Sequence, residues 1–178
     1  MNNFLEKTLE DIIMSNLGKM PSKGLDIFYK NTVNQISFNT CIADIFTWEE
    51  VDDVLYCRII ELKKDCVDES AFWQILNYKF DLFCFISKNY KNIKDIKIEL
   101  ILIGSSFNDN IDLVSSYTGL RLYKYEYGVD GIIFNKKDCW FSDKVIIENY
   151  EYAILNKIDI PNRNSFTDNV IKLARGKI

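Results

Sequence analysis

The sequence contains no histidine among its 178 residues. This absence excludes the Ser-His-Asp triad and Cys-His nucleophile activation, because both need an imidazole as the general base. It also excludes zinc hydrolases with the HEXXH motif and nucleases that depend on a catalytic histidine. Any reaction that this chain catalyses must therefore use carboxylates, lysine, cysteine, tyrosine or a metal ion bound through oxygen.

Close cysteine pairs and long apolar runs are absent as well. The five cysteines stand far apart with no CxxC pair, so zinc or iron–sulfur ligation by sulfur is not expected. The most hydrophobic stretch, residues 80–87, includes Asp81 and is far shorter than the ~20 residues of a membrane span. The N-terminus is acidic and amphipathic and lacks the features of a signal peptide. We therefore expect a cytoplasmic protein with no membrane partner.

Positive charge is also scarce. The 22 lysine and arginine residues are outnumbered by 26 aspartates and glutamates, which gives a formal net charge of −4. This composition excludes a protein that binds nucleic acid through net charge alone. The best candidates for contacts with nucleic acid are five lysines: Lys88, Lys91, Lys94, Lys136 and Lys137.

The sequence does have enough apolar residues, 48%, to build the core of one domain of this length. Helical spacing predicts helices over 3–17, 69–90 and 109–118. Runs rich in Ile, Val, Phe and Tyr predict strands over 25–29, 35–48, 54–64 and 96–104, with a polar hairpin loop at 49–53 and a closing strand or hairpin over 120–135. This order of elements predicts an α/β fold with a mixed central sheet flanked by helices.

The last forty residues carry weaker signals. We expect residues 1–138 to form the core and 139–178 to be a C-terminal extension packed on the same domain. Residues 145–158 fit either a helix or a strand, and residues 165–176 fit a terminal helix.

The candidate chemistry centres on Glu61-Leu62-Lys63, at the end of a predicted strand. Alternation along the strand puts Glu61 and Lys63 on one face of the sheet. The acid-x-Lys triplet alone says little, since Asp95-Ile96-Lys97 is a second instance. Upstream, however, Asp44 interrupts an apolar strand, where an unpaired carboxylate is unfavourable unless a partner or a metal ion neutralises it. Asp44 and Glu61 lie one hairpin apart, and carboxylate oxygens are ligands that suit Mg²⁺ or Mn²⁺.

The predicted helices add polar side chains to this set. Gln74 and Tyr78 are one turn apart on the 69–90 helix, so they share a face from which they can reach the strand ends. Glu10 lies on the 3–17 helix. Glu6 or Asp11 could equally take its place.

The ordered set resembles the PD-(D/E)XK nuclease superfamily. It consists of Glu10, Asp44, Glu61-Leu62-Lys63 and Gln74-Ile75-Leu76-Asn77-Tyr78, and its QxxxY element is similar to that of RecB-like and lambda-exonuclease-like nucleases. The resemblance covers residues 3–134 and implies a restriction-endonuclease-like α-β-β-β-α-β core with a mixed sheet. One departure is Ala43, where the family commonly has proline.

The resemblance implies a metal-dependent nuclease that hydrolyses phosphodiester bonds, in DNA rather than RNA. Asp44, Glu61 and the Leu62 backbone carbonyl would coordinate Mg²⁺ or Mn²⁺, and Glu10 would contact the ion directly or through water. Lys63 would orient or activate the attacking water, while Gln74 and Tyr78 would position Lys63 and the nucleic-acid backbone. A homodimer, or a partner subunit that delivers DNA, is left open.

The same residues also allow purely structural roles. Asp44 could form a buried salt bridge with Lys63 or Arg58. Lys63 could be an ordinary exposed lysine, and Gln74 and Tyr78 could pack the helix against the sheet. The acidic composition favours a second function, that of a catalytically inactive nuclease-fold protein that binds nucleic acid or another protein.

Overall fold

The computed structural model describes residues 2–38, 41–89 and 95–137. The helices in these residues are α1 (Asn2–Ser15), α2 (Glu69–Asn89) and α3 (Asp109–Thr118). The longer strands are β1 (Asn31–Ser37), β2 (Ile42–Val51), β3 (Val54–Leu62), β5 (Asp95–Gly104), β7 (Arg121–Gly128) and β8 (Gly131–Lys136). The short elements are β4 (Cys66–Val67), β6 (Ser106–Phe107) and the 3₁₀ turns η1 (Leu17–Lys19) and η2 (Pro21–Lys23). The expected C-terminal extension, 139–178, lies outside the described residues.

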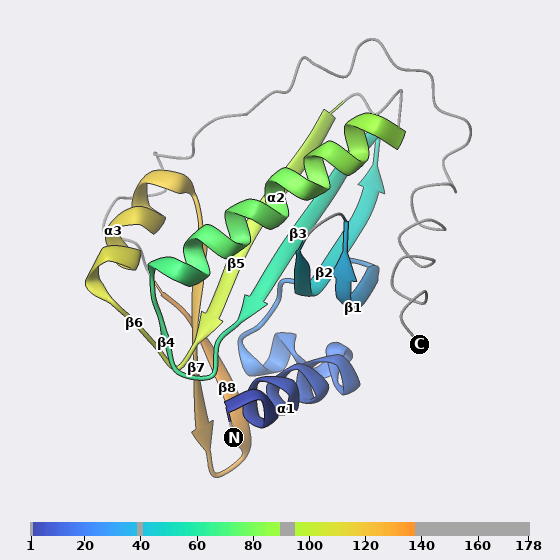
Figure 1. The fold of residues 1–178 in the computed structure, drawn as a ribbon. Coiled ribbons are helices and arrows are strands. Elements are labelled where there is room, and N and C mark those ends of the chain that lie inside the picture. The colour runs from blue at the N-terminus through green and yellow to red at the C-terminus, as the bar shows by residue number, and fades with distance from the viewer. Residues whose placement is uncertain (1, 39–40, 90–94, 138–178) are drawn as a thin grey trace.

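A six-stranded mixed sheet of order β1-β2-β3-β5-β7-β8 runs through the molecule (Figure 1). The β3–β5 and β5–β7 pairs are parallel, and the other neighbouring pairs are antiparallel. Helix α2 connects β3 to β5, because parallel neighbours need a crossover. The order α1, β1, β2, β3, α2, β5 is the predicted α-β-β-β-α-β arrangement, so the predicted fold class is confirmed.

Helices pack on both faces of the sheet, and each face has its own apolar core. The core on the α2 side includes Phe46, Ile59, Ile75, Leu82 and Leu102. The core on the α1 side includes Leu9, Ile13, Leu25, Ile60 and Ile103. Burying one such side chain stabilises the fold by roughly 1.5–3 kcal/mol. Successive residues of β3 enter different cores, so Glu61 and Lys63 follow Ile59 onto the face that α2 covers.

The strand predicted over 25–29 is wrong. Leu25 and Ile27 are buried in the core on the α1 side, but these residues form an extended loop with no strand pairing. The loop is held at its end by a hydrogen bond in which Tyr29 N–H donates to Thr47 Oγ1, at 2.7 Å. The alternation of apolar residues therefore indicates that one side of this segment is buried. It does not distinguish a strand from a packed loop.

The single strand predicted over 35–48 is also wrong, because this segment folds back as β1 and β2. Ser37 pairs with Ile42 in the antiparallel register, so the chain reverses between them. The reversal places Ile36 opposite Ala43, and both enter the core on the α2 side, whereas residues seven apart in one continuous strand would face opposite ways.

The loop predicted over 49–53 is shorter than expected. Val51 still pairs with Val54, and only Asp52 and Asp53 form the turn, both with a left-handed backbone (φ 53° and 68°). Two central residues with positive φ make a tight hairpin turn that matches the twist of the strands. Aspartate tolerates this conformation better than most residues, which explains the local sequence.

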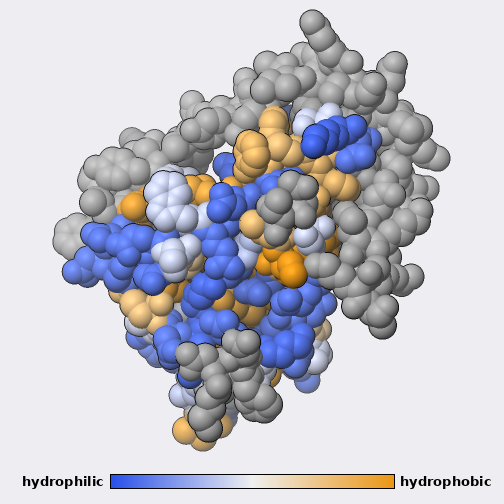
Figure 2. Space-filling model, viewed as in Figure 1, coloured by the Kyte–Doolittle hydropathy of each residue, from blue (hydrophilic) through white to orange (hydrophobic). Residues whose placement is uncertain are grey.

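The surface carries both hydrophobic and hydrophilic residues. Figure 2 shows hydrophobic residues along α2 and mainly hydrophilic residues around the lower ends of β3 and β5. The exposed apolar residues on α2 are Trp73 and Phe80. Among the described helices, none has the length and apolar character needed to cross a membrane.

The loop that follows β3 packs closely against Gly104, and this packing can be tested by mutation. A methyl group on Gly104 would overlap Val67 Cγ2 and would lie 3.2 Å from Asp65 O. We expect Gly104→Ala to lower the free energy of unfolding by about 1–3 kcal/mol through overpacking, measured by urea denaturation.

The matched control is Gly18→Ala, because a methyl group there meets no atom within 4 Å. This variant should be as stable as the wild type. Equal urea midpoints for Gly104→Ala and Gly18→Ala would contradict the prediction, because they would show that residues 65–67 move to accommodate the methyl group without loss of stability.

Candidate active site

The candidate site lies where β3 ends, between β2 and β5. The paired register of β2 and β3 extends to Ile45 and Ile60, and one further step along both strands places Asp44 opposite Glu61. There the Asp44 side chain replaces a backbone acceptor, since Leu62 N–H donates to Asp44 Oδ2 at 2.8 Å. On the other side, Lys63 N–H donates to Ile103 O at 2.8 Å. The end of β3 is therefore fixed by one side chain and one neighbouring strand.

Glu61 is buried in this site, with a relative exposure of 2%. Its Oε1 accepts a hydrogen bond from Lys63 Nζ at 2.7 Å, whereas no donor among the described residues reaches its Oε2. Burial and the charge of Asp44 raise the pKa of Glu61 to about 8, against the opposing effect of Lys63. A buried carboxylate oxygen without a hydrogen bond is rare in folded proteins, and this one is open to a proton or to a positive ligand.

Asp44 experiences the same crowding of negative charge. Burial raises its pKa, the Leu62 amide and the Lys63 ammonium lower it, and the charges of Glu10 and Glu6 raise it further, with a net increase. Glu6 is held next to the site because its carboxylate accepts from Lys64 N–H at 3.2 Å. Lys7 pairs with Glu10, so Lys63 is the ammonium that faces Asp44 and Glu61 together.

Lys63 is joined to α2 by a chain of hydrogen bonds. Its Nζ donates to Gln74 Oε1 at 3.0 Å, and Gln74 Nε2 donates to the Tyr78 hydroxyl. Burial alone would lower the pKa of Lys63, but the charge of Glu61 and its hydrogen bond outweigh burial and raise it. Lys63 is therefore held as a cation. Gln74 and Tyr78 pack the helix against the sheet and also orient this ammonium.

The ion pairs argue against the simplest structural role for Asp44. Lys63 pairs with Glu61 at 2.7 Å, and Arg58 pairs with Glu99 at 2.5 Å. Neither forms its ion pair with Asp44 in the part of the chain that the structure describes.

Glu10 is buried beside this site, but its oxygens are already engaged. Oε1 accepts from Asn34 Nδ2 at 2.5 Å and from Lys7 Nζ at 3.1 Å, and Oε2 accepts from Gln35 Nε2 at 2.6 Å. Gln35 Nε2 also lies 3.4 Å from Asp44 Oδ1. The sequence reasoning missed Asn34 and Gln35. No pattern in the sequence indicates them, because they lie on an ordinary polar strand whose register with Asp44 is set by the fold.

The donor set fits a small divalent cation. Asp44 and Glu61 supply hard oxygen ligands, one of them buried without a hydrogen bond, and their mutual repulsion would be relieved by positive charge. Over residues 2–38, 41–89 and 95–137, no group of three or more Asp, Glu or Cys side chains converges as a ready metal cage. A cation here would need backbone or water oxygens besides the two carboxylates.

The predicted nucleic-acid lysines are scattered. Lys88 lies fourteen residues after Gln74 on α2, about 21 Å along the helix axis from the site. Lys136 lies three strand spacings from Leu62 across the sheet, roughly 14 Å away. Lys137 Nζ lies over the Phe107 ring, 5.3 Å from its centroid. Lys91 and Lys94 lie outside the described residues.

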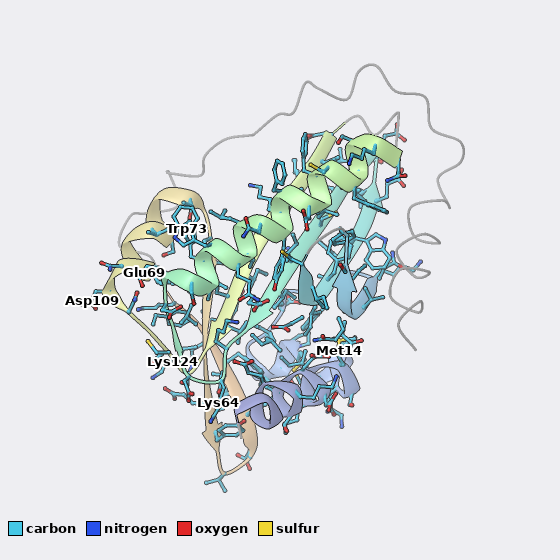
Figure 3. The ribbon with its side chains drawn as sticks, viewed as in Figure 1. Met14, Lys64, Glu69, Trp73, Asp109 and Lys124 are labelled. Carbon is cyan, nitrogen blue, oxygen red and sulfur yellow. The ribbon has the colours of Figure 1, made fainter. Side chains whose placement is uncertain are left out.

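Two lysines that the sequence reasoning did not select lie closer to the end of β3. Figure 3 shows Lys64, in the loop after β3, and Lys124, on β7, at the same end of the sheet. The Lys64 carbonyl accepts a hydrogen bond from the Tyr125 hydroxyl, which joins this loop to β7. Their proximity depends on the parallel β3–β5–β7 arrangement.

The raised pKa of Glu61 predicts how stability depends on pH in the absence of metal. Its pKa is 4.5 ordinarily and about 8 in the folded protein, so the folded state binds the proton more tightly. The stability contributed by this proton is complete below pH 4.5 and is lost as pH rises through 8. We expect Glu61→Gln to remove most of this loss, measured by urea denaturation in EDTA between pH 5 and pH 9.

The matched control for this experiment is Glu126→Gln, which removes an exposed carboxylate and should leave the pH dependence intact. Parallel pH curves for the wild type and Glu61→Gln would contradict the raised pKa assigned to Glu61.

Comparisons with known proteins give one structural similarity. No family model matches the sequence, and no curated protein matches it. The chain is similar in structure to one described as the crystal structure of a repair endonuclease from Pyrococcus abyssi, with a TM-score of 0.46 and 20% sequence identity. The alignment covers 65% of this chain and 46% of the other, so this chain spans less than half of that protein's length.

Proposed function

We propose that this protein is a metal-dependent nuclease that hydrolyses phosphodiester bonds of nucleic acid, DNA in preference to RNA. The observation that carries the proposal is the placement of Lys63. Its ammonium lies between Glu61 and Gln74, next to a buried carboxylate oxygen with no hydrogen bond from the described residues and beside Asp44. A plain salt bridge would not require a second carboxylate there.

In this proposal, Asp44, Glu61 and the Leu62 carbonyl hold Mg²⁺ or Mn²⁺. When bound, such an ion polarises the phosphoryl oxygen and lowers the pKa of a coordinated water. Lys63 orients the attacking water and stabilises the negative charge that develops on the phosphate. Gln74 holds the ammonium in place through its amide oxygen, and Tyr78 fixes the other end of that amide.

The lysines at the end of β3 suit the approach of a phosphate backbone. Lys64 directly follows Lys63, and Lys124 lies at the same end of the sheet, paired with Gly104 of β5, whereas Lys136 lies one strand farther away (Figure 3). The net charge of −4 weakens binding by long-range attraction, so substrate contact relies on these local charges. A homodimer or a partner subunit that delivers DNA would add the missing positive surface, and cytoplasmic location remains our expectation.

Cleavage assays test the proposal directly. Supercoiled plasmid, linear duplex, single-stranded DNA and RNA are incubated with the protein in Mn²⁺ or Mg²⁺. We expect DNA cleavage that EDTA abolishes, and a loss of at least ~10²-fold in rate for Lys63→Ala, the scale of removing one electrostatic stabiliser.

The matched control is Lys97→Ala, which alters the lysine of the second acid-x-Lys triplet and should cleave at the wild-type rate. If Lys63→Ala cleaves DNA at the wild-type rate, the role proposed for Lys63 is wrong. Nucleic-acid binding without cleavage in any of these conditions would instead favour the inactive binding module.

Thermal unfolding with and without Mn²⁺ tests the metal site. An ion that binds only the folded chain stabilises it by about 2.7 kcal/mol at a hundred times its Kd. We expect Mn²⁺ to raise the Tm of the wild type. The side-chain amide in Asp44→Asn keeps an oxygen that can accept from the Leu62 amide, but it carries no charge. We therefore expect Asp44→Asn to raise the Tm of the metal-free protein and to abolish most of the increase in Tm that Mn²⁺ causes.

Asp65→Asn is the control, because Asp65 is an exposed carboxylate in the loop that follows β3. It should keep the full Mn²⁺ increment. A wild type that does not respond to Mn²⁺, together with a destabilised Asp44→Asn, would leave only a structural role for Asp44.

A further inference from the structure

Gln35 has an unusual backbone at a position opposite the candidate metal ligand. In the β1–β2 register Asn34 pairs with Ile45 and Ile36 pairs with Ala43, so Gln35 stands opposite Asp44. Gln35 has φ 50°, in the left-handed region that non-glycine residues rarely adopt. An outlier of this kind inside a strand persists only where the surrounding contacts hold it.

The side-chain alternation of both strands breaks at this point. Val33 and Ile36 of β1 both pack on the α2 side, although residues three apart in a regular strand face opposite ways. On β2, Ala43 and Phe46 also share the α2 side. The interruption of the alternation lies around Gln35 on β1 and around Asp44 on β2, so both residues depart from regular strand geometry at the same point.

The Gln35 amide connects two carboxylates. Its Nε2 donates to Glu10 Oε2 at 2.6 Å and lies 3.4 Å from Asp44 Oδ1. Glu10 is anchored in turn by Asn34 at 2.5 Å and by Lys7 at 3.1 Å. The oxygens of Glu10 are thus filled by protein donors, in contrast to Glu61 Oε2.

We propose that Gln35 is a positioning residue for Asp44, and that Glu10 acts through Gln35 instead of ligating the metal. This inference rests on the proposed function, because it concerns the same metal site. A neutral amide fixes the Asp44 carboxylate beside Glu61 without cancelling its charge, which leaves that charge for the cation. A lysine or arginine in the same place would compete with the cation.

Titration of Mn²⁺ into the metal-free protein, followed by electron paramagnetic resonance, gives a Kd that does not depend on nucleic acid. We expect Gln35→Ala to raise this Kd about 10-fold, the lower end of the range for residues that orient metal ligands. Asn34→Ala is the matched control, because Asn34 touches Glu10 but has no hydrogen bond to Asp44. Its Kd should stay within about 2-fold of the wild type.

Two further variants separate positioning from folding and from ligation. Gln35→Gly should weaken Mn²⁺ binding as much as Gln35→Ala but retain a higher Tm, because glycine adopts positive φ readily. Glu10→Gln should raise the Kd no more than Gln35→Ala does, whereas Asp44→Asn, which removes a ligand charge, should raise it further.

The outcomes are distinct. Wild-type protein that binds no Mn²⁺ overturns the proposed function and this inference with it. Wild-type binding with an unchanged Kd for Gln35→Ala and Gln35→Gly overturns this inference alone. A loss in Glu10→Gln as large as that in Asp44→Asn would make Glu10 a ligand and also overturn it.

Discussion

Mutual repulsion between Asp44 and Glu61 is the constraint on which the rest of the site depends. Two carboxylates share a partly buried strand end, and one ammonium, from Lys63, faces them. Such a pair stays in place only if other groups hold it. The Leu62 amide and the Gln35 amide hold Asp44, while Lys63 holds Glu61 and is itself held by Gln74. The two neutral amides fix Asp44 without offsetting its charge, so the Lys63 ammonium is the cation that faces this pair.

The sequence allowed the parts of this arrangement that depend on local pattern to be predicted. Strand alternation predicted Glu61 and Lys63 on one face, and helical spacing predicted Gln74 and Tyr78 on one face of α2, where Gln74 meets Lys63 and Tyr78 meets Gln74. The existence of the main helices and the mixed sheet followed from the same periodicities. What failed was the pairing of extended segments, since residues 25–29 are buried like a strand but find no neighbour.

The groups that the sequence did not reveal are those whose role depends on tertiary register. Asn34 and Gln35 become informative only once β1 is known to lie opposite Asp44 and α1 to bring Glu10 beside it. The position of a lysine relative to the site likewise depends on the tertiary structure and could not be predicted from local sequence. Lys88 belongs to α2, the helix that carries Gln74, but lies at its far end, whereas Lys124 comes from β7 and lies at the same end of the sheet as Lys64 (Figure 3).

The hydrogen bonds at the strand end also bear on ion selectivity. The Leu62 amide already engages Asp44 Oδ2, and Lys63 already engages Glu61 Oε1. Each carboxylate therefore has at least one oxygen engaged by the protein, and the second Asp44 oxygen also lies near the Gln35 amide, so bidentate ligation is disfavoured. Mg²⁺ keeps a small octahedral shell with several waters, whereas Ca²⁺ favours a larger shell often filled by bidentate carboxylates. In the proposed metal site, the Leu62 amide and Lys63 would therefore disfavour bidentate ligation and would favour the smaller Mg²⁺ over Ca²⁺.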